Sequence, residues 1–172
     1  MNLVELQNKI HAQNKELGWW DEPRPFSTFV CLFHSELSEA MEGDRKGLMD
    51  DHLPKYPMFQ VELADFVIRC LDFLGAQKIQ DYEGVNATCI PIKQTELIAD
   101  LHWIISEAYS SDNDGFWTDR DEELMTAVVV SFNYAEKKDF SLLKIILEKV
   151  EYNKHRADHK RENRAKQGGK KY

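Results

Sequence analysis

Residues 59–74 read FQVELADFVIRCLDFL, a run that is apolar around almost its whole circumference if it forms a helix. Its charged residues recur at steps of three and four: Glu62, Asp65, Arg69 and Asp72. A helix with this much apolar surface is normally buried, and buried charges are costly unless they are paired or bind a metal ion. We therefore expect a central helix whose polar stripe faces a partner.

A matching acidic pair precedes this segment, in the sequence Glu36-Leu-Ser-Glu39. In both pairs, Glu36 with Glu39 and Glu62 with Asp65, the two acids stand three residues apart, so each pair points to one side of a helix. Four carboxylates from two facing helices would form an all-oxygen site, which suits a hard cation such as Mg²⁺ or Mn²⁺. The two acidic motifs therefore predict one divalent-metal site.

Other metal sites fit the sequence less well. Di-iron bundles need Glu-x-x-His pairs, and no histidine follows a glutamate by three residues. Zinc signatures fail for want of paired cysteines or histidines, and no GxGxxG, Walker A or GxSxG motif occurs. The remaining alternative to a metal site is a set of internal salt bridges with Arg69 and Arg45. Asp72 is either a further metal ligand or a partner for Arg69, and the salt bridge is favoured.

Length and composition bound the class of protein. A chain of 172 residues is long enough for one domain with a substantial core, and its net charge of −8 argues against binding a nucleic acid polymer. Cys31, Cys70 and Cys89 form no CxxC motif, and the first two lie in apolar runs, which predicts reduced core cysteines. No segment approaches the roughly 20 apolar residues that span a membrane. We expect a soluble, cytoplasmic protein without a membrane partner.

Helical periodicity dominates the chain, and strand signals are nearly absent. The fold class is therefore expected to be all-α, a bundle of about five to six helices with an irregular segment over 79–94. The expected helices cover about 2–17, Ser27 or Thr28 to Met41, 58–75, Thr95 to Tyr109, Thr118 to Glu136, and Ser141 to about Tyr152. The loop of about a dozen residues before Pro57 allows the ELSEA and ELADF helices to be antiparallel neighbours.

The sequence HSELSEAMEGDRKG (34–47), followed by VELADFVIRCLDF (61–73), resembles the MazG-type all-α nucleoside triphosphate pyrophosphohydrolases. That superfamily also includes dimeric dUTPases and dCTP pyrophosphatases, and it shares an ExxE motif followed by an ExxD motif. The segment GWWDEPRPFSTFVCLFHSELSEA (18–40) and the end of the chain are similar to the single-domain phage and bacterial members. The likeness covers the first three helices and the last one, whereas 76–148 match only as generic helices.

The resemblance implies a single MazG-like domain over 1–172, with Mg²⁺ (or Mn²⁺) held by Glu36, Glu39, Glu62 and Asp65. It implies hydrolysis of a nucleoside triphosphate, with a dNTP favoured, to the monophosphate and pyrophosphate, by attack of a metal-activated water at the α-phosphorus. Glu39, or else Glu36, serves as the base. A homodimer or homotetramer is implied as well.

Two other functions remain open at this point. One is hydrolysis of a nucleoside diphosphate or a modified nucleotide by the same acidic site. The other is a catalytically weak helical interaction or regulatory protein that keeps the acidic motif as a structural metal site. Release of pyrophosphate from a panel of nucleoside triphosphates separates the enzyme from the interaction protein.

Two tryptophans precede the first acidic motif. Trp19 and Trp20 either stack on a nucleobase, since aromatic rings offer faces that accept any base, or fasten the first helix to the core. Asn153, Arg156 and Lys170, which match the family pattern near its end, either clamp the phosphates or belong to a solvated basic end. Both pairs of alternatives stay open from sequence.

Residues 154–172 form a basic tail, with eight lysines and arginines against two acids. Such a segment can act as a lid that supplies cations to a triphosphate without burying charge when the site is empty. We expect deletion of residues 165–172 to raise KM or lower kcat for nucleotide hydrolysis without unfolding the core. Unchanged steady-state kinetics in the truncated protein would identify the tail as a solvated chain end.

Overall fold

A computed structural model describes residues 1–85, 87, 90–164 and 166–169, and within them the protein is all-α, as expected. The elements are α1 (Leu3–Glu16), α2 (Phe26–Lys46), α3 (Met58–Gln77), α4 (Gln94–Asp114), α5 (Trp117–Lys137), α6 (Leu142–His155), a 3₁₀ helix (Ala157–His159) and α7 (Arg161–Arg164). The described residues form no strand, only one isolated bridge between Met49 and Pro57. None of the described helices has both the length and the apolar character that a membrane crossing requires.

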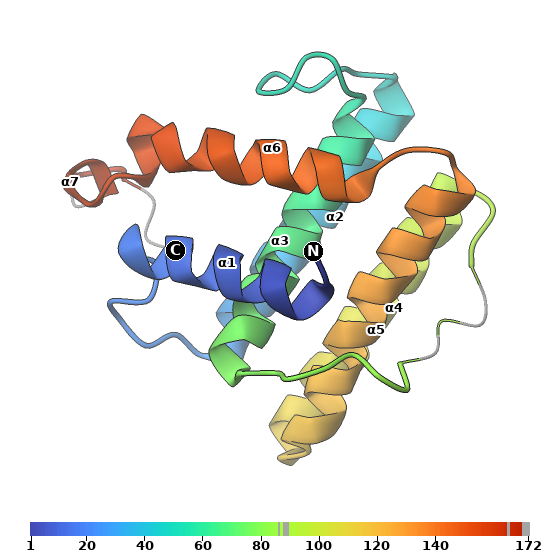
Figure 1. The fold of residues 1–172 in the computed structure, drawn as a ribbon, viewed down its shortest axis with the longest axis horizontal. Coiled ribbons are helices and arrows are strands. Elements are labelled where there is room, and N and C mark those ends of the chain that lie inside the picture. The colour runs from blue at the N-terminus through green and yellow to red at the C-terminus, as the bar shows by residue number, and fades with distance from the viewer. Residues whose placement is uncertain (86, 88–89, 165, 170–172) are drawn as a thin grey trace.

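The helices are arranged around α3 (Figure 1). In this view α1 and α6 cross in front of α3, α2 lies behind it, and α4 and α5 form a hairpin to one side. Helix α3 contacts α1, α2, α5 and α6, and α2 also contacts α4. The central position expected for the apolar helix is therefore confirmed, and so is the pairing of α2 with α3.

The burial of α3 follows from its sequence. Almost every residue from Phe59 to Gly75 is buried, and the residues fully excluded from solvent include Val61, Leu63, Ala64, Phe66, Val67, Cys70, Leu71 and Leu74. At about 25 cal/mol per Å² of apolar surface, one fully buried side chain of this size contributes roughly 1.5–3 kcal/mol. The same packing also encloses Glu62 and Asp72, which are 6% and 7% exposed.

Helix α2 is longer than the sequence predicts at both ends. It begins at Phe26 after Pro25, not with a Ser27 or Thr28 cap, because the proline already sets the extended backbone that precedes a helix. It continues past Met41 to Lys46, and Gly47 ends it in the left-handed conformation with φ 61°. Gly43 does not end the helix; a Cβ there would lie 2.8 Å from Met58 Cβ, so the glycine admits the start of α3.

Two other expectations from sequence need correction. Helix α4 extends beyond Tyr109 to Asp114 and ends at Gly115, and α5 begins at Trp117, one residue before the expected Thr118. Cys31 is exposed on α2, while Cys70 is buried as expected; Cys89 lies outside the described residues. Backbone hydrogen bonds close the turn between α4 and α5, with Gly115 N donating to Asp112 O and Phe116 N to Ser111 O. Ser141 does cap α6, accepting from Lys144 N.

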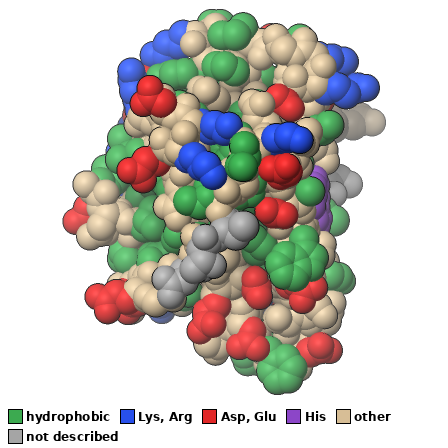
Figure 2. All heavy atoms as spheres, turned by 90° about the vertical axis from the view of Figure 1, so that its right-hand side faces the viewer, with side chains coloured by type: hydrophobic (Ala, Val, Ile, Leu, Met, Phe, Trp, Pro, Cys, Tyr) green, Lys and Arg blue, Asp and Glu red, His purple; other side chains and the backbone are tan. Residues whose placement is uncertain are grey.

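The outer face of the α4–α5 hairpin carries apolar side chains beside acidic ones (Figure 2). Trp103 is 63% exposed, and Phe116 and Trp117 at the turn are 59% and 64% exposed. Ile104 and Ile105, which follow Trp103 in the sequence, are buried in the core. Homo-oligomer formation stays a prediction that rests on the resemblance and on this set of aromatic residues.

The contact between α1 and α3 depends on Gly75, where an added Cβ would lie 2.7 Å from His11 Cβ and 3.1 Å from Gln7 O. We expect Gly75→Ala to lower the free energy of unfolding by about 1–3 kcal/mol, because the methyl group overpacks this contact. Urea unfolding followed by circular dichroism measures the change. In an open helix position the same substitution would stabilise by up to about 1 kcal/mol, so a gain in stability would contradict the close approach.

Candidate metal centre

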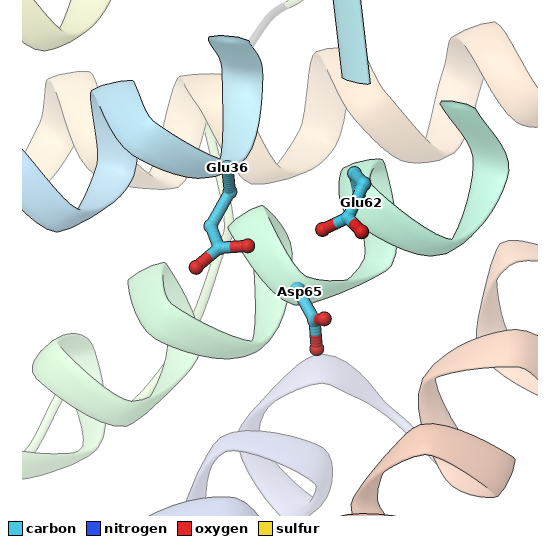
Figure 3. A group of neighbouring side chains, drawn as sticks. All are labelled: Glu36, Glu62 and Asp65. Atoms are coloured by element: carbon cyan, nitrogen blue, oxygen red, sulfur yellow. The ribbon is translucent and has the colours of Figure 1, made fainter. Parts of the chain in front are cut away.

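Three carboxylates meet between α2 and α3 (Figure 3). Glu36 comes from α2, whereas Glu62 and Asp65 stand one turn apart on α3; one oxygen of each lies within 4.8 Å of the others. Glu36 and Glu62 are buried and Asp65 is half-buried. This is the convergence that the two acidic motifs predicted, and it brings together three of the four expected acids.

Glu39 lies outside this cluster. It is exposed one turn beyond Glu36, Ser35 Oγ donates to its Oε1 at 3.2 Å, and it lines the same cavity as the three clustered acids. The difference arises because Glu36 points toward α3, while a residue three positions later on α2 is rotated toward solvent. The carboxylate of Glu39 thus lies on the cavity wall but outside the oxygen cluster that the other three expected acids form.

Two cations compensate the buried acids. Arg69 Nε donates to Glu36 Oε1 at 2.5 Å, and Lys149 Nζ of α6 lies 2.9 Å from Asp65 Oδ2. Lys149 is only 1% exposed, which is rare for a lysine and requires a charged partner. Although burial works against the ammonium, the charge and hydrogen bond of Asp65 raise the pKa of Lys149. Of the two arginines expected to pair with the acids of the cluster, Arg69 does so, through Glu36. Arg45 instead pairs with Glu42 at the surface.

Two carboxyl groups of the cluster have raised pKa values. Burial, followed by the charges of Asp65 and Glu36, raises the pKa of Glu62 to about 9. Burial also raises the pKa of Glu36, against the opposing effect of Arg69. Glu62 is therefore protonated at neutral pH unless a further cation neutralises the site.

The residues fit a hard divalent cation. All donor atoms are carboxylate oxygens, which Mg²⁺ and Mn²⁺ prefer. Crowded acids with raised pKa values gain from a bound cation, because the cation stabilises their ionised forms. Glu36, Glu62 and Asp65 are the residues that would hold the ion.

The cluster opens into a cavity of about 370 Å³, a size typical of small-molecule sites. Acids line one part of it: Glu36, Glu39, Glu62, Asp65 and Asp72. Cationic, aromatic and amide side chains line the remainder, including Trp19, Arg24, Arg69, His52, Lys149, Asn153, Arg156 and His159. Two of these side chains hold buried polar atoms without a hydrogen-bond partner among the described residues, namely Arg24 Nε and Asn153 Oδ1.

The two tryptophans have different environments. Trp20 stacks on Phe29 with ring centroids 5.3 Å apart, and its Nε1 donates to Asp72. It therefore fastens the loop after α1 to the core, which was the structural alternative. Trp19 lines the cavity, with Arg164 over its ring at 4.0 Å. Stacking of Trp19 on a base stays a prediction.

The expected pairing of Asp72 with Arg69 is wrong. Asp72 accepts from His11 Nδ1 at 2.9 Å, from Asn14 Nδ2 at 2.8 Å and from Trp20 Nε1. These donors come from α1 and the loop after it, whereas the guanidinium of Arg69 turns toward α2. Asp72 thus joins α1 to α3 and is not part of the carboxylate cluster.

The basic tail contributes to the same cavity. Arg156 of the tail and the preceding Asn153 line it, and Arg156 also makes a bidentate pair with Asp158; a phosphate clamp by these residues stays a prediction. Arg161 pairs with Asp21 through two hydrogen bonds, and Arg164 donates to Leu17 O. The described part of the tail therefore packs on the loop between α1 and α2. Lys170 lies outside the described residues, and closure of the tail over a nucleotide stays a prediction.

Lys149, His52 and Arg24 are cavity residues that the sequence reasoning missed. A signal for Lys149 was present, because it occupies a core position on the apolar face of the last helix, beside Ile145, Ile146 and Val150. A lysine at such a position indicates a buried carboxylate partner. His52 and Arg24 lie in loops, and no helical pattern marks them.

Comparisons with known proteins add no assignment: no family model, curated protein or solved structure matches the chain.

Glu62 and Asp65, the two acids that α3 contributes to the cluster, should respond oppositely to neutralisation in the metal-free protein. Glu62 ionises near its ordinary pKa of 4.5 when unfolded but near 9 when folded, so its contribution to stability is present below pH 4.5 and is lost as pH rises toward 9. At pH 8 we expect Glu62→Gln to raise the free energy of unfolding by about 1–2 kcal/mol. Asp65→Asn should lower it by about 3 kcal/mol, because Lys149 loses its buried partner.

Thermal denaturation with EDTA measures both effects, at about 2–4 °C per kcal/mol for a chain of this size. Relief of repulsion between acids would by itself leave Asp65→Asn as stable as the wild type or more stable, so the sign of its shift tests the role of Lys149. Equal shifts of the same sign in the two variants would contradict the separate roles of Lys149 and the acid cluster.

Proposed function

We propose that the protein is a divalent-cation-dependent nucleoside triphosphate pyrophosphohydrolase. The observation that carries this proposal is the composition of one cavity: a cluster of three carboxylates adjoins several cationic and aromatic side chains. Acids alone would suit many cation-binding proteins, and cations alone would suit many anion-binding ones. Both in one cavity suit a polyphosphate that arrives with a bound Mg²⁺. The sequence resemblance to MazG-type hydrolases points to the same activity.

The acids have the positions needed to hold the ion. Glu36, Glu62 and Asp65 supply the oxygens, while Arg69 and Lys149 orient two of these carboxylates through their ion pairs. When bound, Mg²⁺ supplies a water of lowered pKa and neutralises charge on the phosphoryl oxygens. Lys149 also lines the cavity, and an ammonium group has three N–H donors, one more than its contacts with Asp65 and His52 use.

Glu39 is the base in this proposal. Its exposed carboxylate lies on the cavity wall, outside the cluster, where it can take a proton from water. The water oxygen bonds to the α-phosphorus as the bond from that phosphorus to the bridging oxygen breaks. The bridging oxygen leaves with the pyrophosphate, and the proton passes from water to Glu39 and then to solvent. The products are a nucleoside monophosphate and pyrophosphate.

The other part of the cavity suits the nucleoside. Trp19 offers an aromatic ring, and Asn14, whose Nδ2 is used by Asp72, keeps its side-chain oxygen as an acceptor. Arg24 donates to Trp19 O through one nitrogen, and its Nε is buried without a partner among the described residues. A base placed here would gain both stacking and polar contacts.

One observation favours the non-enzymatic alternative. Arg69 and Lys149 already neutralise two acids of the cluster, so internal ion pairs alone can account for part of the burial of charge. A helical interaction protein with a structural acidic site would keep these pairs and turn over no nucleotide. The activity test below separates the two functions.

Pyrophosphate release from the eight common ribo- and deoxyribonucleoside triphosphates tests the proposal directly. We expect release that requires Mg²⁺ and stops with EDTA. In ¹⁸O-labelled water the label should enter the monophosphate, because attack occurs at the α-phosphorus. Glu36→Gln and Glu39→Gln should each lower kcat by about 10²-fold or more.

Glu42→Gln is the matched control, because Glu42 continues the same series on α2 but pairs with Arg45 and Lys46 at the surface. Its kinetics should equal those of the wild type. Absence of turnover with all eight substrates, in a protein that binds Mg²⁺ through Glu62 and Asp65, would favour the interaction protein. Label in the pyrophosphate would move the site of attack to the β-phosphorus.

A further inference from the structure

His52 lies at the boundary between two cavities. It lines the cavity of the carboxylate cluster and also a neighbouring groove of about 520 Å³ beside the C-terminal end of α6. Arg156 is the other residue shared by the two. The proposed function uses the first cavity and gives the groove no role.

The contacts of His52 fix which ring nitrogen carries the hydrogen. Lys149 Nζ lies 3.3 Å from His52 Nδ1. An ammonium group only donates, so Nδ1 must accept, and the hydrogen of the neutral ring is on Nε2. Burial, followed by the charge of Lys149, lowers the pKa of His52, which keeps the ring neutral. Within the part of the chain that the structure describes, the hydrogen bonds of His52 are made by its backbone N–H and by Nδ1, and none is made by Nε2.

The loop that carries His52 is held in place. Asp50 is 4% exposed, and its Oδ1 accepts from His52 N at 2.9 Å and from Leu53 N at 2.6 Å. The imidazole ring packs against Tyr152 of α6 with centroids 4.9 Å apart. The Nε2–H donor is therefore set in position before any ligand arrives, which lowers the entropy cost of using it.

The neighbours of His52 are suited to an anion. Lys149, Asn153 and Arg156 follow one another along α6 and lead from His52 toward the tail, where His159 contacts Trp19. If Trp19 receives the base, His52 lies at the other end of this row, where the terminal phosphates of a triphosphate would lie. The groove beyond His52 and Arg156 then offers a route from the cavity to solvent.

We propose that His52 Nε2–H binds a phosphate oxygen of the leaving pyrophosphate, and that His52 and Arg156 guide this product into the groove. This inference rests on the proposed function. It assigns to His52 a direct contact with the pyrophosphate half of the substrate. The alternative role is positioning, in which His52 acts only by holding Lys149 against Asp65.

Two substitutions separate these roles. In His52→Asn the side-chain oxygen can replace Nδ1 as the acceptor for Lys149, but the donor at the ε position is lost. In His52→Gln the amide nitrogen can replace Nε2 as a donor, while the acceptor at the δ position is lost. Each variant is the matched control for the other, and thermal denaturation checks that both are folded.

The measurement is the affinity for inorganic pyrophosphate with Mg²⁺, by isothermal titration calorimetry on the full chain. We expect His52→Gln to bind within about threefold of the wild type and His52→Asn to bind about tenfold more weakly, as for the loss of one hydrogen bond to a charged group. If His52→Asn binds pyrophosphate as tightly as the wild type, the proposal is overturned. If, in addition, His52→Gln binds it more weakly, the positioning role is assigned to His52. No pyrophosphate binding by the wild type would overturn the proposal as well.

Binding of pyrophosphate needs no turnover, so this result is independent of the activity assay. A protein that hydrolyses nucleotides but binds pyrophosphate equally in all three forms keeps the proposed function and loses the role of His52. A protein that binds pyrophosphate through Nε2 but releases none from any triphosphate loses the proposed function, and the anion contact of His52 remains.

Discussion

The burial of charge on one apolar helix is the constraint on which the rest of the structure depends. Helix α3 lies in the centre of the bundle and carries Glu62 and Asp65 into the interior. Isolated charges there would cost several kcal/mol each. The structure offsets this cost from two sides, with Arg69 at Glu36 and Lys149 at Asp65. The position of α6 across α3 is thus an electrostatic requirement as well as a packing arrangement.

This compensation also explains how an acidic cluster can be ready for a metal ion. A cage of bare carboxylates would repel itself, and a fully paired cage would have no affinity for a cation. Here no cation among the described residues hydrogen-bonds to Glu62, and its raised pKa keeps a proton in the site. A divalent cation can replace that proton, while the two ion pairs persist and fix the remaining oxygens. The cluster is therefore only partly neutralised by the protein itself.

Local pattern accounts for most of what the sequence predicted correctly. The all-α fold, the central position of α3 and the meeting of Glu36, Glu62 and Asp65 all follow from acids placed at helical spacing in apolar sequence. What the sequence could not give are contacts between distant elements. Asp72 was assigned to Arg69 because both lie on one helix, yet its partners His11 and Asn14 belong to α1. His52 and Arg24 were missed because loops carry no periodicity, and Glu39 was grouped with the cluster because spacing alone does not show the rotation of α2 against α3.

The pairing of Asp65 with Lys149 has a consequence for biosynthesis. The two residues are separated by about 80 positions, so the ribosome completes α2 to α5 before α6 emerges. Until then the nascent bundle holds its acids without the buried ammonium that partners one of them. Chains fold from the N-terminus as they are made, and this one carries an electrostatic obstacle that only its last long helix removes. The acidic site and the fold are therefore completed in the same step, when α6 packs on α3 and brings Lys149 to Asp65.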